Sequence, residues 1–273
     1  MIKITNLEKK YGDLEVLKNI TETIEDGEII SIIGPSGSGK STFLRCLNLI
    51  EEPTSGTIEV DGLQANRDID INEYRRHMGM VFQKFNLFAH MNVLKNVTYA
   101  LEYHLLKERK KQKRKINISK IKHFFNKKVE IISEEIKSKK EIKEFVKKKA
   151  FDFLERIGLK DKAFEYPNKL SGGQQQRIAI IRSLMLDPKV MLFDEPTSAL
   201  DPEMVNDVLD LIKKVTKQNR TVIIVTHEMG FAKEISTRVM FMDGGYIVEQ
   251  GSPKEIFENP KNKRTQEFLS KVL

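Results

Sequence analysis

Residues 29–42 read Ile29-Ile30-Ser31-Ile32-Ile33-Gly34-Pro35-Ser36-Gly37-Ser38-Gly39-Lys40-Ser41-Thr42, and this stretch decides the fold of the chain. Its first five residues are mostly β-branched, as expected for a strand that is buried on both faces. A glycine-rich segment follows, and Phe43, Leu44 and Leu47 then return at helical spacing. A strand, a glycine-rich turn and a helix form the context in which a G-x-x-x-x-G-K-[ST] pattern indicates a phosphate-binding loop.

The chemistry of this loop follows from its residue types. Gly34, Gly37 and Gly39 let the backbone curl with its N–H groups directed at an anion, and the following helix adds its positive dipole end. Lys40 is predicted to reach the β- and γ-phosphates of a nucleotide, and the Ser41 hydroxyl to ligate Mg²⁺. The predicted nucleotide contacts of the loop are Gly34, Pro35, Ser36, Gly37, Ser38, Gly39, Lys40, Ser41 and Thr42.

Composition narrows the class of protein. The chain has 273 residues, 40% of them hydrophobic, which is enough for one large core or two modest ones. It has no run of 18 apolar residues, and residues 1–5 lack the apolar segment of a signal peptide. We therefore expect neither a membrane-spanning helix nor a secretion signal. The single cysteine, Cys46, excludes a disulfide framework and fits a reducing compartment.

The net charge of +8 is concentrated in one segment. Between His104 and Lys149 there are 18 Lys and Arg against 6 Glu, which leaves −4 for the rest of the chain. Apolar residues at helical spacing around a polar turn at 137–140 predict a helical hairpin here, with arms about 25 Å long. The predicted apolar faces are Ile121, Phe125, Ile132 and Ile136 on the first arm, and Ile142, Phe145/Val146, Phe153/Leu154 and Ile157 on the second.

Apolar strands alternate with helical segments elsewhere in the chain. Residues 78–82, 190–193 and 222–225 are predicted strands, which indicates a mostly parallel sheet covered on both faces. Residues 2–7 are predicted to form an edge strand, and residues 56–63 a hairpin strand. The predicted fold class is therefore α/β.

Polar residues follow the ends of these strands. Gly34, Gln83, Asp194 with Glu195, and His227 each come directly after a predicted strand. In parallel sheets, ligands bind beyond the carboxyl ends of the strands. We therefore expect these residues to lie together at one edge of the sheet.

Two further stretches are candidates for nucleotide contacts. Ser171 is a natural helix N-cap in Leu170-Ser171-Gly172-Gly173-Gln174, and the glycines leave N–H groups open to an anion at that helix start. Tyr11, before Gly12 and well ahead of the phosphate loop, is either a packed surface aromatic or a ring that stacks on adenine.

Taken together, the motifs resemble the ATP-hydrolysing subunit of an ABC transporter. They are the phosphate loop 34–42, Val81-Phe82-Gln83, Leu170–Gln174, Val190–Glu195, Ser198–Asp201 and Thr226-His227. The resemblance covers about 1–103 and 150–273. The group it is most similar to is the bacterial polar-amino-acid uptake ATPases, through residues 78–88, 201–205, 227–231 and 264–273. The tail is expected to end as in that group, without an added regulatory domain, and the basic segment departs from it.

The resemblance implies a P-loop NTPase (RecA-like) core with an N-terminal antiparallel β subdomain and an α-helical subdomain that carries the basic hairpin. It implies one ABC ATPase domain over 1–273. Within it, residues 1–84 and 171–273 form the nucleotide-binding core with its β subdomain, and 85–170 form the helical subdomain. The lysine-rich insertion is 104–149.

The resemblance also implies a role for each site residue, with ATP and Mg²⁺ as cofactors. Glu195 would act as general base on the attacking water, and His227 would hydrogen-bond the γ-phosphate. Gln83 would sense Mg²⁺ and water while its segment contacts the membrane subunit. Asp194 would hold Mg²⁺ through water, beside Ser41. The implied nucleotide-binding set also includes Tyr11, Ser171, Gly172, Gly173 and Gln174, with Ser171 and Gly173 acting on the nucleotide of an opposite protomer.

The implied assembly is a head-to-tail homodimer on the cytoplasmic face of the cell membrane, attached peripherally. Its partners would be integral-membrane permease subunits and, indirectly, an extracytoplasmic substrate-binding protein. Substrate choice lies with those partners, so the chain does not name the amino acid.

Two alternatives stay open at this point. A cell-division-type or other non-transport ABC ATPase, with a membrane or nucleic-acid partner, would share a short single cassette. The insertion 104–149 is either a solvated decoration or a surface for anionic lipid. Nucleic-acid binding is not expected there, because few aromatic residues are present to stack on bases.

Overall fold

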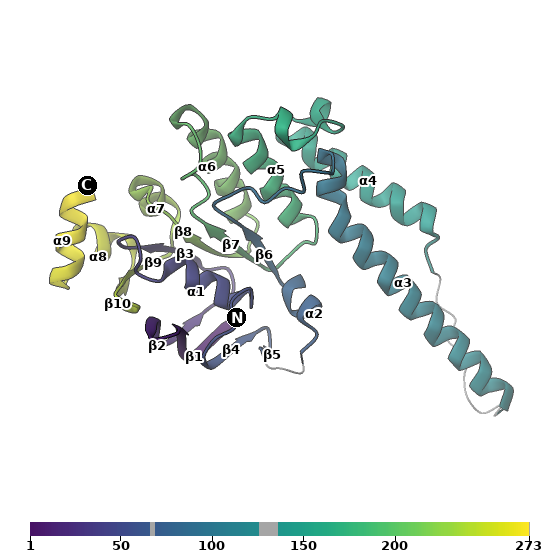
Figure 1. The fold of residues 1–273 in the computed structure, drawn as a ribbon, viewed down its shortest axis with the longest axis horizontal. Coiled ribbons are helices and arrows are strands. Elements are labelled where there is room, and N and C mark those ends of the chain that lie inside the picture. Colours follow the sequence, from purple (N-terminus) through teal and green to yellow (C-terminus); the bar gives the residue numbers. More distant parts are fainter. Residues whose placement is uncertain (66–68, 126–135, 273) are drawn as a thin grey trace. The chain divides into compact units, whose positions relative to one another are not determined.

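The structure, a computed structural model, describes residues 1–65, 69–125 and 136–272. The chain forms two compact units, one made of Met1–Asn86 with Ser171–Leu273 and the other of Leu87–Leu170. Figure 1 shows their helices and strands. Every residue predicted to contact nucleotide belongs to the first unit.

The first unit contains an antiparallel sheet near the N-terminus. Its strand order is β2-β1-β4-β5, where β1 is Ile2–Tyr11, β2 Leu14–Ile24, β4 Ser55–Val60 and β5 Leu63–Gln64. The prediction of an edge strand at residues 2–7 is wrong, because β1 pairs with β2 on one side and β4 on the other. The alternating pattern instead reflects a sheet with one buried face, on which Ile2 and Ile4 lie.

The second sheet has the order β10-β9-β3-β8-β7-β6. Its strands are β3 Ile29–Ile33, β6 Met78–Val81, β7 Val190–Asp194, β8 Thr221–Val225, β9 Arg238–Asp243 and β10 Tyr246–Gly251. All neighbours pair in parallel except β9 and β10, which are antiparallel. The predicted α/β fold with a mostly parallel sheet and an N-terminal antiparallel sheet is therefore confirmed.

Helices flank these sheets in the first unit (Figure 1). They are α1 Lys40–Leu47, α2 Ile71–Arg76, α5 Gly172–Leu184, α6 Pro202–Thr216, α7 Met229–Ile235, α8 Pro253–Glu258 and α9 Lys263–Val272. Strand β3 is buried on both faces, as its sequence predicts. Ile30 and Ile32 belong to a core that includes Phe43 of α1 and Ile4 of β1, whereas Ile33 packs in a separate core with residues of α7, α8 and α9.

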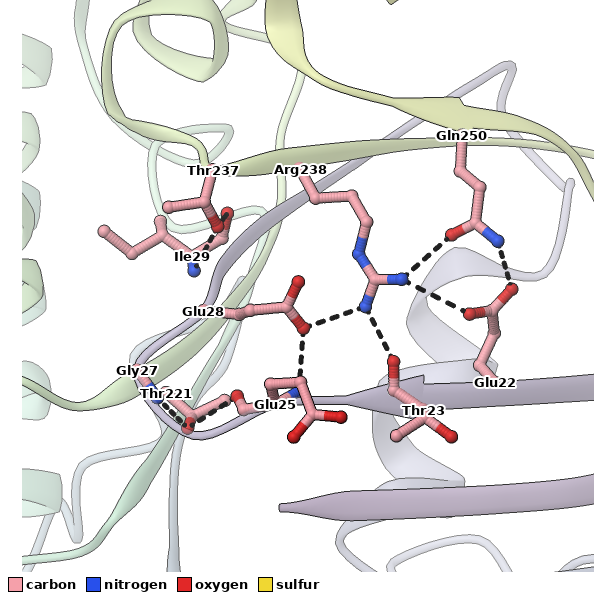
Figure 2. A network of polar contacts seen from close by, with 10 residues as sticks. All are labelled: Glu22, Thr23, Glu25, Gly27, Glu28, Ile29, Thr221, Thr237, Arg238 and Gln250. Carbon is pink, nitrogen blue, oxygen red and sulfur yellow. Dashed lines mark hydrogen bonds and ion pairs between the residues drawn. The ribbon is translucent and has the colours of Figure 1, made fainter.

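An arginine-centred network joins the two sheets (Figure 2). The Arg238 guanidinium donates to the Thr23 carbonyl oxygen at 2.8 Å, to the Glu28 carboxylate at 2.9 Å and to Gln250 Oε1 at 3.3 Å. The Glu22 carboxylate lies 3.6 Å from the same guanidinium. Burial raises the pKa of Glu22, although Gln250 and Arg238 favour its charged form. The network therefore ties β2 to the starts of β3 and β9 and to β10.

The second unit is mainly helical. It contains α3 Val93–Phe125, α4 Lys139–Arg156 and the short 3-10 helices η1 Lys160–Lys162 and η2 Pro167–Lys169. Helices α3 and α4 contact each other, and the buried positions of α4 are Ile142, Val146, Ala150 and Leu154. Ser138 and Glu141 form a capping box that starts α4.

The helical segment differs from its prediction in extent. Helix α3 begins at Val93, before the predicted insertion, and its part within the insertion, 104–125, spans about 33 Å at 1.5 Å per residue. Helix α4, with 18 residues, spans about 27 Å, against predicted arms of about 25 Å. Ile136 precedes α4 in non-helical backbone, so it is not on a first arm, and Phe145 is exposed rather than part of the buried face. Ile132, with the rest of 126–135, lies outside the described residues. Across 1–65, 69–125 and 136–272, the structure has no helix with the length and apolar character to cross a membrane.

Candidate nucleotide-binding site

The loop between β3 and α1 has the shape that its glycines predict. Gly34 has φ +146°, and a Cβ placed on it would lie 2.0 Å from the Met242 carbonyl oxygen. Gly39 has φ +101°, and a Cβ there would lie 2.8 Å from the Val16 carbonyl oxygen. Both positions therefore require glycine, for backbone conformation and for space.

Lys40 is buried at the start of α1. Its ammonium donates to the carbonyl oxygens of Gly34 at 2.9 Å and Pro35 at 2.8 Å. Burial lowers the pKa of Lys40, and the carboxylates of Glu195 and Asp194 partly offset this effect. An ammonium has three N–H donors, so these carbonyls leave one for an anion.

Ser38 adds a polar atom that fits an anion. Its Oγ is buried and has no hydrogen-bond partner within the part of the chain that the structure describes. The Ser38 backbone N–H donates to the Pro35 carbonyl oxygen at 3.3 Å, which closes the loop into a tight turn. A buried hydroxyl without a partner is costly in isolation and can donate to a phosphate oxygen.

Of the three residues predicted to act on Mg²⁺, which are Ser41, Gln83 and Asp194, Ser41 and Asp194 are in direct contact. Ser41 Oγ, in the first turn of α1, donates to Asp194 Oδ1 at the end of β7 at 2.6 Å. Arg45 Nη2 lies 3.3 Å from Asp194 Oδ2. The described residues contain no group of three or more His, Cys, Asp and Glu side chains arranged for a metal. A cation at Ser41 and Asp194 would thus need further oxygen ligands from phosphate and water, as Mg²⁺ commonly has.

Two predicted catalytic residues also meet, although they come from different strands. Glu195 follows β7 and His227 follows β8, and Glu195 Oε1 lies 3.2 Å from His227 Nε2. The Glu195 backbone has φ +46°, which is uncommon for a residue with a side chain, and its N–H donates to the Val225 carbonyl oxygen at 3.0 Å. The strained backbone is held at the end of the sheet, in the position where ligands bind.

The structure does not bring all predicted residues together. Gln83 follows β6 as expected but is exposed, and no described hydrogen bond joins its side chain to Ser41, Asp194 or Glu195. Tyr11, at the end of β1, is 44% exposed, with the Lys9 ammonium 4.7 Å from its ring centroid. The ring is thus partly exposed, with the Lys9 ammonium over one face.

The second glycine-rich stretch begins α5. Ser171 Oγ accepts from the Gln174 N–H at 3.3 Å, and Gln174 Oε1 accepts from the Ser171 N–H at 3.0 Å. This capping box uses Gln174 structurally. A Cβ on Gly173 would lie 2.9 Å from Cβ of Met204 in α6, whereas Gly172 leaves space at van der Waals distance. No described hydrogen bond or ion pair joins residues 171–174 to the loop 34–42, so the two stretches do not form one site within this chain.

Sequence reasoning missed two contributors. Arg45 lies one helical turn after Ser41, on the same side of α1, and that i, i+4 spacing was the available signal. Gln176 is fully buried, and its Nε2 donates to the Pro196 carbonyl oxygen at 2.9 Å, next to Glu195. Nothing in the local sequence distinguishes Gln176 from Gln175.

Comparisons with known proteins agree with this geometry. A family model described as ABC transporter matches residues 17–198. The arginine transport ATP-binding protein ArtM of Bacillus subtilis (strain 168) is 48% identical over 274 residues, covering 100% of both chains. The glutamine transport ATP-binding protein GlnQ of Geobacillus stearothermophilus is also 48% identical, covering 100% of this chain and 99% of its own.

Solved structures show the same fold. The dimeric, post-hydrolysis ATP-binding cassette MJ0796, bound to ADP and Pi, superimposes with a TM-score of 0.72 at 31% identity. The superposition covers 93% of this chain and 99% of the MJ0796 chain.

Proposed function

Because the chain belongs to the ABC transporter family, we propose that it is the ATP-hydrolysing subunit of an importer for a polar amino acid. The main support for ATP hydrolysis is that two pairs of side chains are in contact beside the phosphate loop: Ser41 with Asp194, and Glu195 with His227. The full-length similarity to arginine and glutamine transport ATP-binding proteins supports the substrate class. The same similarity favours uptake over a cell-division-type or other non-transport role.

The residues of the loop bind and position the triphosphate. Lys40 and the Ser38 hydroxyl each have a donor for phosphate oxygens, and the N–H groups of the loop and α1 add to them. Ser41 and Asp194 would hold Mg²⁺, which neutralises charge on the phosphates when bound. Tyr11 offers its exposed ring to the adenine.

Glu195 is placed to orient and deprotonate the attacking water, because its carboxylate lies at the strand end beside the loop. His227 Nε2 contacts Glu195 Oε1 and so orients the carboxylate. A neutral imidazole has a single N–H donor, so we propose that this donor turns from Glu195 to the γ-phosphate when the nucleotide binds. Gln83 lies on an exposed loop away from these residues, and we propose that it contacts the nucleotide site only on dimer closure and so reports the state of the nucleotide to the rest of the transporter.

The functional unit is a head-to-tail homodimer. No described hydrogen bond or ion pair joins Ser171, Gly172, Gly173 or Gln174, at the start of α5, to the phosphate loop of their own chain. The solved cassette MJ0796, to which the chain is similar, is dimeric. In the proposed dimer, the start of α5 from each protomer completes the nucleotide site of the other. Dimer closure on ATP then drives integral-membrane permease subunits, with an extracytoplasmic binding protein acting indirectly.

We propose that two parts of the chain have different roles in this function. Residues 1–84 and 171–273 act as the nucleotide-binding core, and 85–170 as the helical part that includes the insertion 104–149. The assembly is peripheral, on the cytoplasmic face of the membrane.

The insertion is proposed to contact anionic lipid from that position. Exposed cations on α3 and α4 outnumber exposed acids there; they include Lys110, Lys111, Lys113, Lys139, Lys143 and Lys148. Each lysine near an anionic bilayer contributes about 1 kcal/mol. A few such contacts would hold the subunit against the bilayer beside its permease.

Mixed dimers test the proposed function. Ser171→Arg subunits block the opposite site, and Lys40→Ala subunits lose their own loop. Each heterodimer should then hold one site with both lesions and one intact site, so mixing should restore ATPase that neither homodimer has. If no mixing ratio restores activity while wild-type protein is active, the shared-site dimer is wrong.

A further inference from the structure

Side chains of helix α5 hydrogen-bond to the backbone on both sides of Gln83, before it and after it in sequence. Ser183 Oγ donates to the Met80 carbonyl oxygen at 2.8 Å, within β6. Arg182 donates to the carbonyl oxygens of Asn86 at 2.7 Å and Phe85 at 3.4 Å. The exposed Gln83 therefore lies in a short loop whose two ends are fixed to the same helix.

Gln176 connects this loop to the catalytic glutamate. Its side-chain amide donates to the Pro196 carbonyl oxygen at 2.9 Å and to the Phe82 carbonyl oxygen at 3.4 Å. Pro196 directly follows Glu195, and Phe82 directly precedes Gln83. An amide NH₂ has two N–H donors, so one side chain can serve both carbonyls. The Gln176 side chain is fully buried, which makes these donors hard to replace by water.

The same helix begins at Ser171, which the proposed dimer places on the opposite nucleotide. Gln176 lies five positions after Ser171, within two turns of the helix start. A shift of the helix start therefore reaches Pro196 and Phe82 through a single rigid element and one side chain.

We propose that Gln176 is a positioning residue that couples the two ATP sites of the dimer. When the start of α5 engages the partner's nucleotide, Gln176 sets the backbone next to Glu195 and Gln83 of its own site. Arg182 supports this by fixing the far end of the Gln83 loop. The inference rests on the proposed dimeric ATPase and assigns a residue to the communication between its half-sites.

The test is Gln176→Met, which keeps the length of the side chain and removes both donors. Gln175→Met, on the same helix, is the matched control. In full-length protein, the variant should keep the affinity for a fluorescent ATP analogue within about twofold, because the loop 34–42 is untouched. Its kcat should fall about tenfold, the size expected for losing the buried hydrogen bond to the Pro196 carbonyl oxygen at 2.9 Å; the bond to Phe82, at 3.4 Å, is the weaker of the two. The Hill coefficient for ATP should fall toward 1, and the control should match wild-type protein.

Arg182→Lys tests the same coupling if Gln176→Met fails to fold. Arg182→Lys retains the charge but has no fork to span Phe85 and Asn86. It should speed amide hydrogen exchange at 83–87 and lower the Hill coefficient, again without loss of nucleotide affinity. Unchanged cooperativity in folded variants of both residues, with active wild-type protein, would overturn the coupling role alone. Inactive, monomeric wild-type protein would instead overturn the proposed function.

Discussion

Replacing Gly34 with alanine tests how tightly the phosphate loop is built against the sheet. The added Cβ would lie 2.0 Å from the Met242 carbonyl oxygen in β9, far inside the distance that real Cβ atoms keep. Both atoms belong to or adjoin buried strands, so neither the loop nor β9 can yield easily. The residue also has φ +146°, a conformation that alanine rarely adopts.

The expected cost combines two effects. Positive φ in a residue with a Cβ costs about 1–2 kcal/mol, and forcing an extra carbon into a packed region costs about 1–3 kcal/mol more. Gly34→Ala should therefore lower the free energy of unfolding by roughly 2–5 kcal/mol. Gly37→Ala is the matched comparison, because Gly37 has φ +78° but open space around its Cβ position. It should cost only about 1–2 kcal/mol.

Urea unfolding followed by circular dichroism measures both variants against wild-type protein. Gly230→Ala serves as a control for the method, since its Cβ would meet nothing within 4 Å in helix α7. It should leave stability equal or raise it by up to ~1 kcal/mol. A Gly34→Ala protein no less stable than Gly37→Ala would refute the close contact between the loop and Met242.

Four further outcomes are expected. Glu195→Gln should keep ATP affinity but reduce hydrolysis by ~10²–10⁴-fold, with ATP-bound dimers accumulating on size exclusion; normal turnover would remove Glu195 from its role. Cys46 should resist thiol reagents in native protein and react only on unfolding, because burial raises its pKa to about 12. Burial raises the pKa of Glu22 in the folded protein, so its contribution to stability is present at low pH and is lost as pH rises through that pKa. The stability of wild-type protein relative to Glu22→Gln should therefore fall as pH rises above the ordinary titration range of a glutamate; a rise would mean that Arg238 outweighs burial. Binding to phosphatidylglycerol vesicles at low salt should weaken when six exposed lysines of the insertion are changed to Gln, namely Lys110, Lys111, Lys113, Lys139, Lys143 and Lys148. The control changes six exposed lysines elsewhere to Gln, namely Lys3, Lys214, Lys217, Lys254, Lys263 and Lys271, and should bind more strongly than the first variant. Equal binding by the two variants would mean that the insertion is a solvated decoration.

The parts of this protein that could be predicted from sequence share a physical basis. Buried strands such as 29–33 and 190–193 are continuous apolar runs, and the polar residues that follow them meet because parallel strands end at one edge. This rule predicts that Glu195 and His227 lie at the same edge, and in the structure they are in contact.

Other features depend on contacts that no local pattern records. The interior place of β1 depends on β4, some 50 residues away, and the same alternation would suit an edge strand. Helix α3 continues from Val93 into a lysine-rich stretch where apolar periodicity is weak, so the single continuous helix was not predicted. Gln176 and Arg45 act through atoms on distant strands and loops. Gln176 looks equivalent to its neighbour Gln175, and the spacing of Arg45 from Ser41 does not by itself identify Asp194 as its partner.

The place of β3 in its sheet has a consequence for biosynthesis. Among the strands of the described residues, β3 pairs with β8 and β9 alone, and the residues of both are made about 190 or more positions later. At about 5–20 residues per second, some 10–40 s pass on the ribosome before either partner exists. During that interval the second unit is complete, while an isoleucine-rich strand that the folded protein buries on both faces stays without its neighbours. Newly made chains therefore depend on protection of residues 29–33 until the last third of the protein has emerged.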